Sequence, residues 1–260
     1  EKEIFSDLSA WQTVQLARHP NRPYTLDYIH AWCDDFIELH GDKAFADDHA
    51  VVAGIGTIGT HRAVIIGQQK GRNTKENLYR NFGMMKPEGY RKALRVMKIA
   101  EKFHLPIVTL IDTPGADPGI AAEERGQGFA IANNLMEMAS IDTPILTIVI
   151  GEGASGGALG IGLCDKMLML QNTWFSVISP EGCASILWKD SSKAPEAAEA
   201  LKLTPKDLME HDICNMIIHE PVGGAHRHFD ETILIVKKAL IEEIDSFKKD
   251  ESISYLDSRV

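Results

Sequence analysis

Cysteine is scarce in this chain of 260 residues, and no two cysteines are close in the sequence. The four cysteines are Cys33, Cys164, Cys183 and Cys214, and none belongs to a C-x-x-C pair. This spacing argues against a disulfide framework and against a zinc ribbon, and it is typical of a reducing compartment. We therefore expect a cytoplasmic protein that binds no metal.

Long hydrophobic runs are also lacking. The longest apolar stretches are too short to cross a bilayer, and no signal-peptide pattern opens the chain, so we expect no membrane association. Residue 1 is Glu and not Met, which is consistent with a trimmed chain. Basic residues are outnumbered, and the net charge of −10 disfavours general nucleic-acid binding.

Nucleotide-binding fingerprints are absent or misplaced. No G-x-x-x-x-G-K-[ST] loop occurs in the sequence. Residues 54–59 match G-x-G-x-x-G, but residues 63–66 that follow are Ala-Val-Ile-Ile and indicate a strand. A dinucleotide fingerprint must open a helix, so we interpret these glycines as structural.

The rest of the chain alternates between strand-like and helix-like segments. Predicted helices cover residues 4–18, 25–40 (ended by Gly41), 87–104, 123–140, 180–188 and 229–247, with a short one from residue 158. Predicted strands cover residues 50–58, 62–68, 106–111, 144–150, 166–170, 174–178 and 213–219. Strands separated by helices predict a largely parallel sheet and an α/β class.

The most informative segment is a glycine-rich turn between a strand and a helix. The β-branched run from Ile145 to Ile150 leads into Gly-Glu-Gly-Ala-Ser-Gly-Gly, and an Ala/Leu/Ile helix follows. Adjacent Gly156 and Gly157 at a helix N-terminus leave backbone N–H groups free and unshielded by side chains. Such groups and the helix dipole suit a negative oxygen, so we predict an oxyanion hole at these two glycines.

Three alternatives remain open for this turn. Residues 153–157 also match G-x-S-x-G, the nucleophile elbow of a serine hydrolase, with Ser155 as nucleophile. That hypothesis needs partners such as Asp207 or Asp212 with His226, a choice that is arbitrary among ten histidines. The turn could also be purely structural, and the chain a non-catalytic scaffold that docks a partner.

Two further turns follow predicted strands. Residues 112–119 read Asp-Thr-Pro-Gly-Ala-Asp-Pro-Gly, and residues 68–72 read Gln-Gln-Lys-Gly-Arg. Residues just past the ends of successive parallel strands tend to face one crevice. We therefore predict one site, unless the 112–119 turn is only a rigid double turn. The predicted substrate-binding residues are Gly115, Ala116, Gly119, Gly153, Ser155, Lys70 and Arg72.

Positive charge is concentrated between Lys70 and Lys98. This segment contains nine basic residues and only two acidic ones, Glu76 and Glu88. Its local charge is therefore +7, and the charge of the rest of the chain is −17. One interpretation is a solvated helix face with a basic loop. The other is a surface for an anionic ligand such as a phosphorylated cofactor, with Arg72 as the leading residue.

Taken together, these turns resemble the alpha subunits of the bacterial acetyl-CoA carboxylase carboxyltransferase. The resemblance runs from about Phe5 to Arg227 and includes G-Q-Q-K-G-R, I-D-T-P-G-A, S-G-G-A-L and V-I-S-P-E-G-C-A-S-I-L-W-K. All matching stretches are residues 24–28, 67–72, 81–84, 87–93, 111–116, 123–127, 149–153, 155–159, 177–189 and 223–227.

The resemblance implies a crotonase/ClpP-like α/β fold, a spiral of ββα units with N-terminal helices. On this basis we expect an N-terminal helical segment over residues 1–48, as a truncated extension, and a carboxyltransferase domain over residues 49–260. Within the family, Gly156 and Gly157 would form the oxyanion hole of the alpha subunit. The implied reaction moves the carboxyl group of carboxybiotin to the coenzyme A thioester acetyl-CoA and gives malonyl-CoA for fatty-acid synthesis.

The resemblance also implies partners. We expect activity only with a zinc-ribbon beta subunit, in an alpha2beta2 assembly served by biotin carboxyl carrier protein, with biotin carboxylase in the wider complex. The sequence departs from the family pattern in three ways. Asp117 stands where an aromatic residue is usual, Ala154 replaces a common Gly, and a further N-terminal helical extension of the family is not present.

Overall fold

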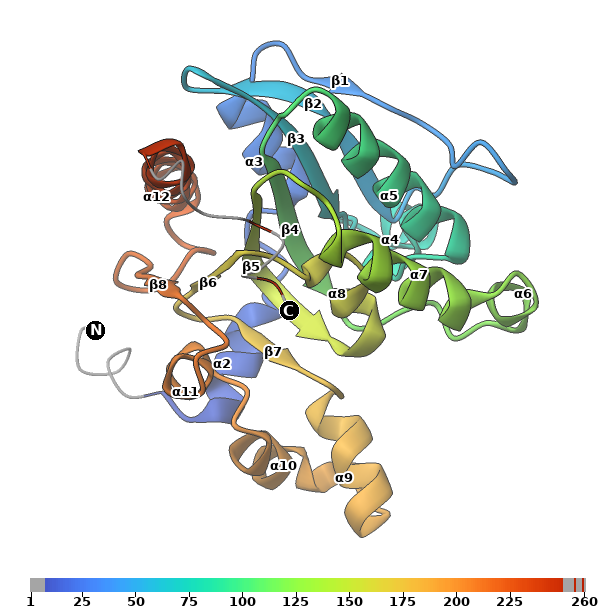
Figure 1. The fold of residues 1–260 in the computed structure, drawn as a ribbon. Helices are drawn as coiled ribbons and strands as arrows, with labels where there is room; N and C mark the ends of the chain where they lie inside the picture. The colour runs from blue at the N-terminus through green and yellow to red at the C-terminus, as the bar shows by residue number, and fades with distance from the viewer. Residues whose placement is uncertain (1–7, 250–254, 256–258, 260) are drawn as a thin grey trace.

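A mixed sheet of eight strands runs through the centre of the computed structural model, which describes residues 8–249, Tyr255 and Arg259 (Figure 1). The order is β1-β2-β3-β4-β5-β6-β8, and β7 pairs with the far end of β5. Pairs β1–β2 and β2–β3 are antiparallel, and the others are parallel. The strands are β1 (Ile37–Glu38), β2 (Val51–Ile58), β3 (His61–Gln68), β4 (Ile107–Thr113), β5 (Ile145–Ala154), β6 (Lys166–Leu170), β7 (Trp174–Ser176) and β8 (Met216–Ile218).

Helices cover both faces of the sheet. The α-helices are α2 (Ala10–Ala17), α3 (Thr25–Trp32), α4 (Thr74–Tyr79), α5 (Pro87–Lys102), α6 (Ile120–Glu124), α7 (Gln127–Ala139), α8 (Ser155–Gly162), α9 (Pro180–Trp188), α10 (Ala194–Leu201), α11 (Pro205–Glu210) and α12 (Phe229–Lys249). Two 3-10 turns, η1 (Asn81–Gly83) and η2 (Ser191–Lys193), also occur. None of the helices within the described ranges combines the length and apolar character that crossing a membrane requires.

The core divides into two layers because side chains alternate along each strand. In β5, Ile145 and Val149 pack with α5, α7 and α8, whereas Leu146 and Ile148 pack with α3 and α12. A strand buried on both faces reads as a continuous apolar run, which is what the sequence shows here. This packing fixes the central strands in place, so the turns that follow them begin from rigid strand ends.

The glycines of the 54–59 motif serve packing. Residues 51–58 and 61–68 form a hairpin, so the segment after the motif is a strand, as predicted. A side chain at Gly54 would overlap the carbonyl oxygen of Ile37 and come within 2.5 Å of the Phe36 ring. Gly54 therefore allows β1 and Phe36 to lie directly on the backbone of β2.

The predicted helix over residues 25–40 is wrong in its second half. The α3 helix ends at Trp32, and Cys33 is already extended, with φ −128° and ψ 120°. The carboxylate of Asp35 accepts hydrogen bonds from the backbone N–H and hydroxyl of Thr57, at 2.7 Å each. These bonds draw the chain to the sheet edge, where residues 37–38 pair with β2.

Other boundaries shift by smaller amounts. The predicted helix over residues 123–140 is two helices, because Gly126 adopts φ +80° between α6 and α7. The first predicted helix starts at Ala10, behind a capping box of Ser9 and Gln12, and Ile4 lies outside the described residues. Helices α4, α10 and α11 were not predicted. The proposed boundary after residue 48 remains a prediction, and the β1–β2 pairing spans it.

Candidate functional site

Three turns meet at one edge of the sheet, at the carboxyl ends of neighbouring strands. Parallel pairing places Gly67 beside Leu110 and Thr113 beside Gly153, so β3, β4 and β5 end near one another. A side chain at Gly157 would overlap Gly115 and lie 2.5 Å from the amide nitrogen of Ala116. The turns after β4 and β5 are therefore in direct contact, in the arrangement that the sequence predicts.

The first turn of α8 presents unpaired backbone donors. Strand β5 passes directly into this helix, with Ala154 as the N-cap residue and no side chain capping the helix. The N–H groups of Gly156 and Gly157 lack the intrahelical acceptor that later residues have. Gly156 is half-buried, and a side chain there would meet only the Ile131 methyl group, at 3.3 Å. The N–H groups at this end of α8 can donate hydrogen bonds to a negatively charged oxygen.

The predicted contact residues around this helix differ in what they offer. Ala116 is half-buried, and its N–H has no hydrogen-bond acceptor among the described residues. Gly153 is buried in β5, where a side chain would come within 2.5 Å of the Phe175 ring. The N–H of Gly119 is already donated to Asp117 Oδ1, at 2.7 Å. Gly153 and Gly119 thus support the turns, whereas Ala116 lies at the open side of the contact.

Asp117 fastens the turn after β4. Besides the bond to Gly119, its Oδ2 accepts from the side-chain amide of Asn81, at 3.1 Å. Asn81, Phe82 and Gly83 all have positive φ, at +46°, +56° and +77°. Such a run is strained for non-glycine residues and persists because the contacts around it hold it. The Asp117 carboxylate, which stands where the resemblance leads us to expect an aromatic residue, is therefore committed to this internal link.

Lys70 is the centre of a buried ion network, and not a free cation. Its Nζ lies 2.6 Å from Asp112 Oδ1 and 2.9 Å from Glu152 Oε1. The other oxygen of Glu152 accepts from Arg18 Nε, at 2.7 Å. The predicted contact of Lys70 with an anionic substrate would have to compete with two internal carboxylates.

The shifts in pKa follow from this burial and pairing. Burial alone would lower the pKa of Lys70, but the carboxylates of Asp112 and Glu152 raise it above its usual value. Burial would raise the pKa of Glu152, yet Lys70 and Arg18 hold it below its usual value. At Asp112, burial prevails over Lys70 and raises the pKa. The network braces the ends of β4 and β5, which Glu152 N also links by donating to Asp112 Oδ1 at 3.1 Å.

Arg72 also bonds within the protein. Its guanidinium lies 4.1 Å from the centre of the Tyr24 ring and pairs with Asp27. It further donates to the carbonyl oxygens of Pro20 and Arg22, at 2.6 and 2.9 Å. Arg72 lines a cleft of about 360 Å³ that also contains Glu76. Its bonds tie the loop after β3 to the segment that enters α3, and none reaches the glycine turns.

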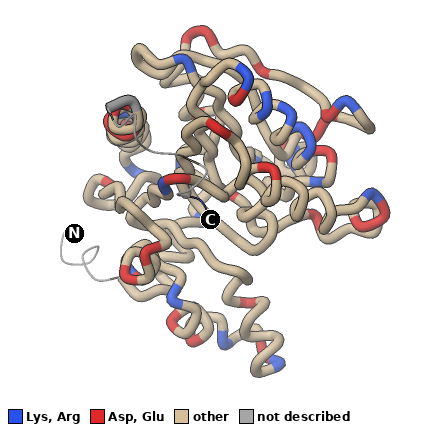
Figure 2. The backbone as a smooth tube through the Cα atoms, in the orientation of Figure 1, with Lys and Arg blue, Asp and Glu red and all other residues tan. Residues whose placement is uncertain are grey.

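Most other cations of the basic segment are also engaged. Figure 2 shows Lys and Arg along α5. Arg91 pairs with Asp42 at 2.8 Å, and the buried Lys92 pairs with Asp47 at 2.9 Å. Lys98 pairs with Glu101 in the same helix and with Glu137 of α7. The local excess of charge is thus largely used in bonds that join α5 to the segments beside it, so it is neither simply a solvated helix face nor freely available to an anionic ligand.

The serine-hydrolase alternative finds no assembled triad. Ser155 is exposed and has φ +58°, but no hydrogen bond joins it to a histidine or carboxylate in the described part of the chain. Asp207 accepts from Thr204 in a capping box, with 2.6 Å to the hydroxyl. His226 instead lies against His19, with ring centres 4.1 Å apart. The three groups serve three separate local structures.

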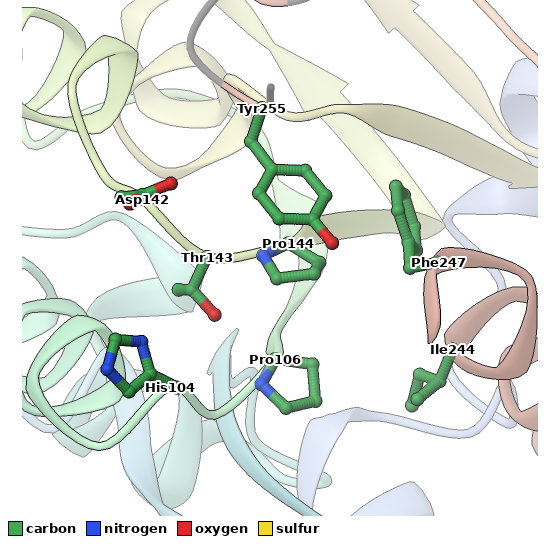
Figure 3. Close-up of a pocket in the computed structure, with 8 residues that line it drawn as sticks. All are labelled: His104, Pro106, Asp142, Thr143, Pro144, Ile244, Phe247 and Tyr255. Carbon is green, nitrogen blue, oxygen red and sulfur yellow. The ribbon is translucent and has the colours of Figure 1, made fainter. Parts of the chain in front are cut away.

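A separate cavity lies at the opposite ends of β4 and β5, under α12 (Figure 3). It holds about 210 Å³, and its lining includes Pro106 and Pro144, which precede the two strands, with Phe247 and Tyr255 across from them. None of the predicted site residues lines it. Within residues 8–249, Tyr255 and Arg259, no three His, Cys, Asp or Glu residues are grouped so that they could hold a metal ion.

Sequence reasoning found the glycine turns but missed their supports. Arg18 and Glu152 are 134 positions apart, and Lys70 and Asp112 are 42 apart. No local pattern signals such pairs. The one usable signal was that Asp112 directly follows a predicted strand and Lys70 lies two residues after another.

Comparisons with known proteins agree with this geometry. A family model described as acetyl co-enzyme A carboxylase carboxyltransferase-like matches residues 1–260. The acetyl-coenzyme A carboxylase carboxyl transferase subunit alpha of Xanthomonas campestris pv. campestris (strain B100) is 60% identical over 247 residues, which are 95% of this chain and 77% of that protein.

Two solved structures share the fold. The transcarboxylase 12S structure with methylmalonyl-coenzyme A bound has a TM-score of 0.66 at 18% identity, over 90% of this chain and 44% of that chain. A Pseudomonas malonate decarboxylase hetero-tetramer in complex with coenzyme A has a TM-score of 0.70 at 12% identity, over 90% and 91% of the two chains. The expected crotonase-like α/β fold is confirmed.

Proposed function

Because this chain belongs to the acetyl-CoA carboxylase carboxyltransferase family, as an alpha subunit, we propose that the first turn of α8 stabilises charge on the ureido oxygen of biotin during carboxyl transfer. The overall reaction is carboxyl transfer from carboxybiotin on its carrier protein to acetyl-CoA, which gives malonyl-CoA for fatty-acid synthesis. The observation that carries the proposal is the pair of uncapped donors at Gly156 and Gly157 against the Gly115–Ala116 peptide.

The required chemistry explains why two glycines suffice on this chain. Carboxybiotin supplies an activated carboxyl group, and its ureido nitrogen can take the methyl proton of acetyl-CoA when the carboxyl group leaves. The N–H groups of Gly156 and Gly157 would donate to the ureido oxygen as negative charge gathers there. Loss of one such donor typically costs on the order of 2.7–4 kcal/mol of transition-state stabilisation. No acid–base side chain of this chain is needed, in keeping with the absence of an assembled triad near Ser155 among the described residues.

Lys70, Asp112 and Glu152 would act by holding the strand ends in place. A buried ion pair contributes little net stability, but removal of one partner is costly, so such a network keeps its members in one arrangement. We assign no substrate contact to Lys70 or Arg72, because both bond to protein groups. Ser155 is assigned a place beside the substrate, without a nucleophilic role.

Exposed apolar side chains around α8 support a partner subunit at this face. Ile120 and Phe129 are 80% and 78% exposed on α6 and α7. Val177 and Ile186 are 75% and 70% exposed after β7 and on α9, on the other side of α8 (Figure 1). Exposed large apolar side chains on neighbouring elements are the kind of residue that a partner subunit would cover. We propose that the beta subunit covers them and supplies the half of the site that binds the coenzyme A thioester.

The wider assembly follows the family. We propose an alpha2beta2 carboxyltransferase with a zinc-ribbon beta subunit, which receives carboxybiotin from biotin carboxyl carrier protein and works with biotin carboxylase. A cytoplasmic location suits a fatty-acid synthesis enzyme with four widely spaced cysteines, all of them free thiols.

The test is reconstitution. This chain and a beta subunit should together catalyse malonyl-CoA-dependent carboxylation of free biotin, whereas each chain alone should not. A Gly157→Val chain mixed with the same beta subunit is the negative control. Activity of this chain alone, or none in the mixture of two folded subunits, would contradict the proposal.

A further inference from the structure

Gln68 is a fully buried glutamine at the end of β3, with no exposed surface. Its backbone is fixed, because its carbonyl oxygen accepts from the Thr25 hydroxyl at 2.6 Å. Its Nε2 also lies 3.6 Å from the sulfur of the buried Met85, and a buried uncharged amide is costly unless both of its ends are bonded. We therefore look for a role of the Gln68 side chain in its hydrogen bonds and not only in packing.

Both ends of the Gln68 amide bond to backbone groups of the candidate site. Its Oε1 accepts from the N–H of Asp112 at 3.0 Å, where β4 leads into its turn. Its Nε2 donates to the carbonyl oxygen of Gly157 at 2.8 Å, in the first turn of α8. The opposite orientation of the amide would point donor at donor and acceptor at acceptor, so the partners themselves fix it.

Gln68 thus links the same two turns that touch at Gly157 and Gly115. The contact at Gly157 prevents the turns from coming closer, because no room for a side chain remains there. The Gln68 bridge prevents them from moving apart. We propose that Gln68 is a positioning residue that fixes the first turn of α8 relative to the Ala116 peptide and so places the Gly156 and Gly157 donors.

This inference rests on the proposed function, because a positioning role needs a reaction to position for. Displacement of reacting groups by about 1 Å can cost on the order of 100-fold in rate. A residue that only positions donors should change the turnover number and leave substrate affinity largely alone.

The first experiment compares two buried amides in the complex with the beta subunit. Gln68→Met keeps the length of the side chain and removes both bonds. Asn134→Leu is the matched control, because Asn134 is equally buried and donates to the carbonyl oxygens of Tyr90 and Gly160, one turn further along α8. Both variants should lower Tm to a similar extent. We expect Gln68→Met to lower kcat about 10- to 100-fold with KM values within about 3-fold, and Asn134→Leu to leave kcat within about 3-fold.

The second experiment restores the donor by pH. In Gln68→Glu, the protonated carboxyl can accept from Asp112 N–H and donate to the Gly157 carbonyl, whereas the ionised carboxyl has no donor. The ratio of variant to wild-type kcat should therefore rise as pH falls. The same ratio for Asn134→Leu should stay flat.

The outcomes separate the two proposals. If the wild-type complex transfers no carboxyl group, the proposed function fails. If the wild-type complex is active and Gln68→Met has normal kcat, or falls only as far as Asn134→Leu at equal loss of Tm, the positioning role is wrong. A pH-independent ratio for Gln68→Glu would likewise overturn it.

Discussion

Strands β4 and β5 differ between their two ends, and the difference supports the proposal that the reaction takes place at their carboxyl ends. Where they begin, their backbone groups are bonded: Pro144 O accepts from Ile107 N at 2.8 Å, and Asp165 bonds both backbone groups of Ile145. Where they end, the N–H groups of Gly156 and Gly157 lie in an uncapped first helical turn, and no acceptor for them occurs among the described residues. Buried polar groups are normally satisfied, so donors left open at one end only point to a ligand there.

Arg259 completes the closed end. Its guanidinium pairs with both oxygens of Asp165, at 2.7 Å each, and donates to the carbonyl oxygens of Met138, Ile141 and Thr143. Its side chain is fully buried. The neighbouring cavity of Figure 3 is lined mainly by rigid prolines and rings. We therefore expect the closed end to contribute to the stability of the fold, and the open end to contribute to the reaction.

The largest effect should come from Gly157→Val at the open end. The side chain would overlap Gly115 and the Ala116 amide, so the two turns must part. We expect transfer by the reconstituted complex to fall about 10³-fold or more, while the chain stays folded, with about 1–3 kcal/mol less stability. Steady-state kinetics and circular dichroism measure both. Gly156→Ala is the control, since it meets only the Ile131 methyl group and should be far milder; equal losses in the two variants would refute the difference between them.

At the closed end, Arg259→Ala should affect stability and spare chemistry. Loss of the guanidinium removes the charged partner Arg259 from the buried Asp165 carboxylate, so the free energy of unfolding should drop by about 3 kcal/mol. Turnover per folded molecule should stay within about 2-fold, since no donor of α8 moves. Lys238→Ala, which breaks an exposed pair with Glu242, should cost below about 0.5 kcal/mol. Denaturant titration measures the loss of stability in Arg259→Ala and in Lys238→Ala. A large loss of kcat in Arg259→Ala would contradict the proposal that the closed end serves stability alone.

A pH series should reveal the ion network at the open end. The pKa of Glu152 is lowered in the fold, so its ionised form adds stability that is present above the unfolded value near 4.5 and is lost as pH falls through the folded value. The stability gap between wild type and Glu152→Gln should therefore narrow below about pH 4.5. Asp112, whose raised pKa acts in the opposite sense, is present in both proteins. Glu196→Gln is the control, because Glu196 forms an exposed pair with Lys193, and its difference in stability from wild type should not change with pH. A difference for Glu152→Gln that is equally independent of pH would contradict the role of the ion network.

The smallest effect should come from Ser155→Ala. The hydroxyl is not the nucleophile, so transfer by the complex should stay within about 3-fold of wild type. A fluorophosphonate probe should leave Ser155 unlabelled. Stable labelling, or loss of activity equal to that of Gly157→Val, would restore the hydrolase hypothesis.

The sequence predicted the open end better than the closed one, for a physical reason. Glycine turns after apolar strands are local patterns, and the rule for parallel strands brought residues 115–119 and 153–157 together correctly. Arg259 and Asp165 are 94 positions apart, and Gln68 and Gly157 are 89 apart, so their bonds depend on how the layers stack. Local periodicity also misled at Phe36 and Ile37, whose apolar spacing suits a helix. Instead the Phe36 ring and the carbonyl oxygen of Ile37 lie on the glycine backbone of β2, and the Ile37 side chain is exposed. The substrate contacts and the domain boundary remain predictions.

The bond between Arg18 and Glu152 has a consequence for how the protein is made. The ribosome completes α2 long before its acceptor on β5, since 134 residues separate the partners. At 5–20 residues per second, the wait is roughly 7–27 s. During that interval the apolar side of α2, with Val14 at its centre, has neither Ala154 nor Trp174 to rest on. The candidate site is thus assembled late in synthesis, and the apolar side of α2 stays without these two partners until then.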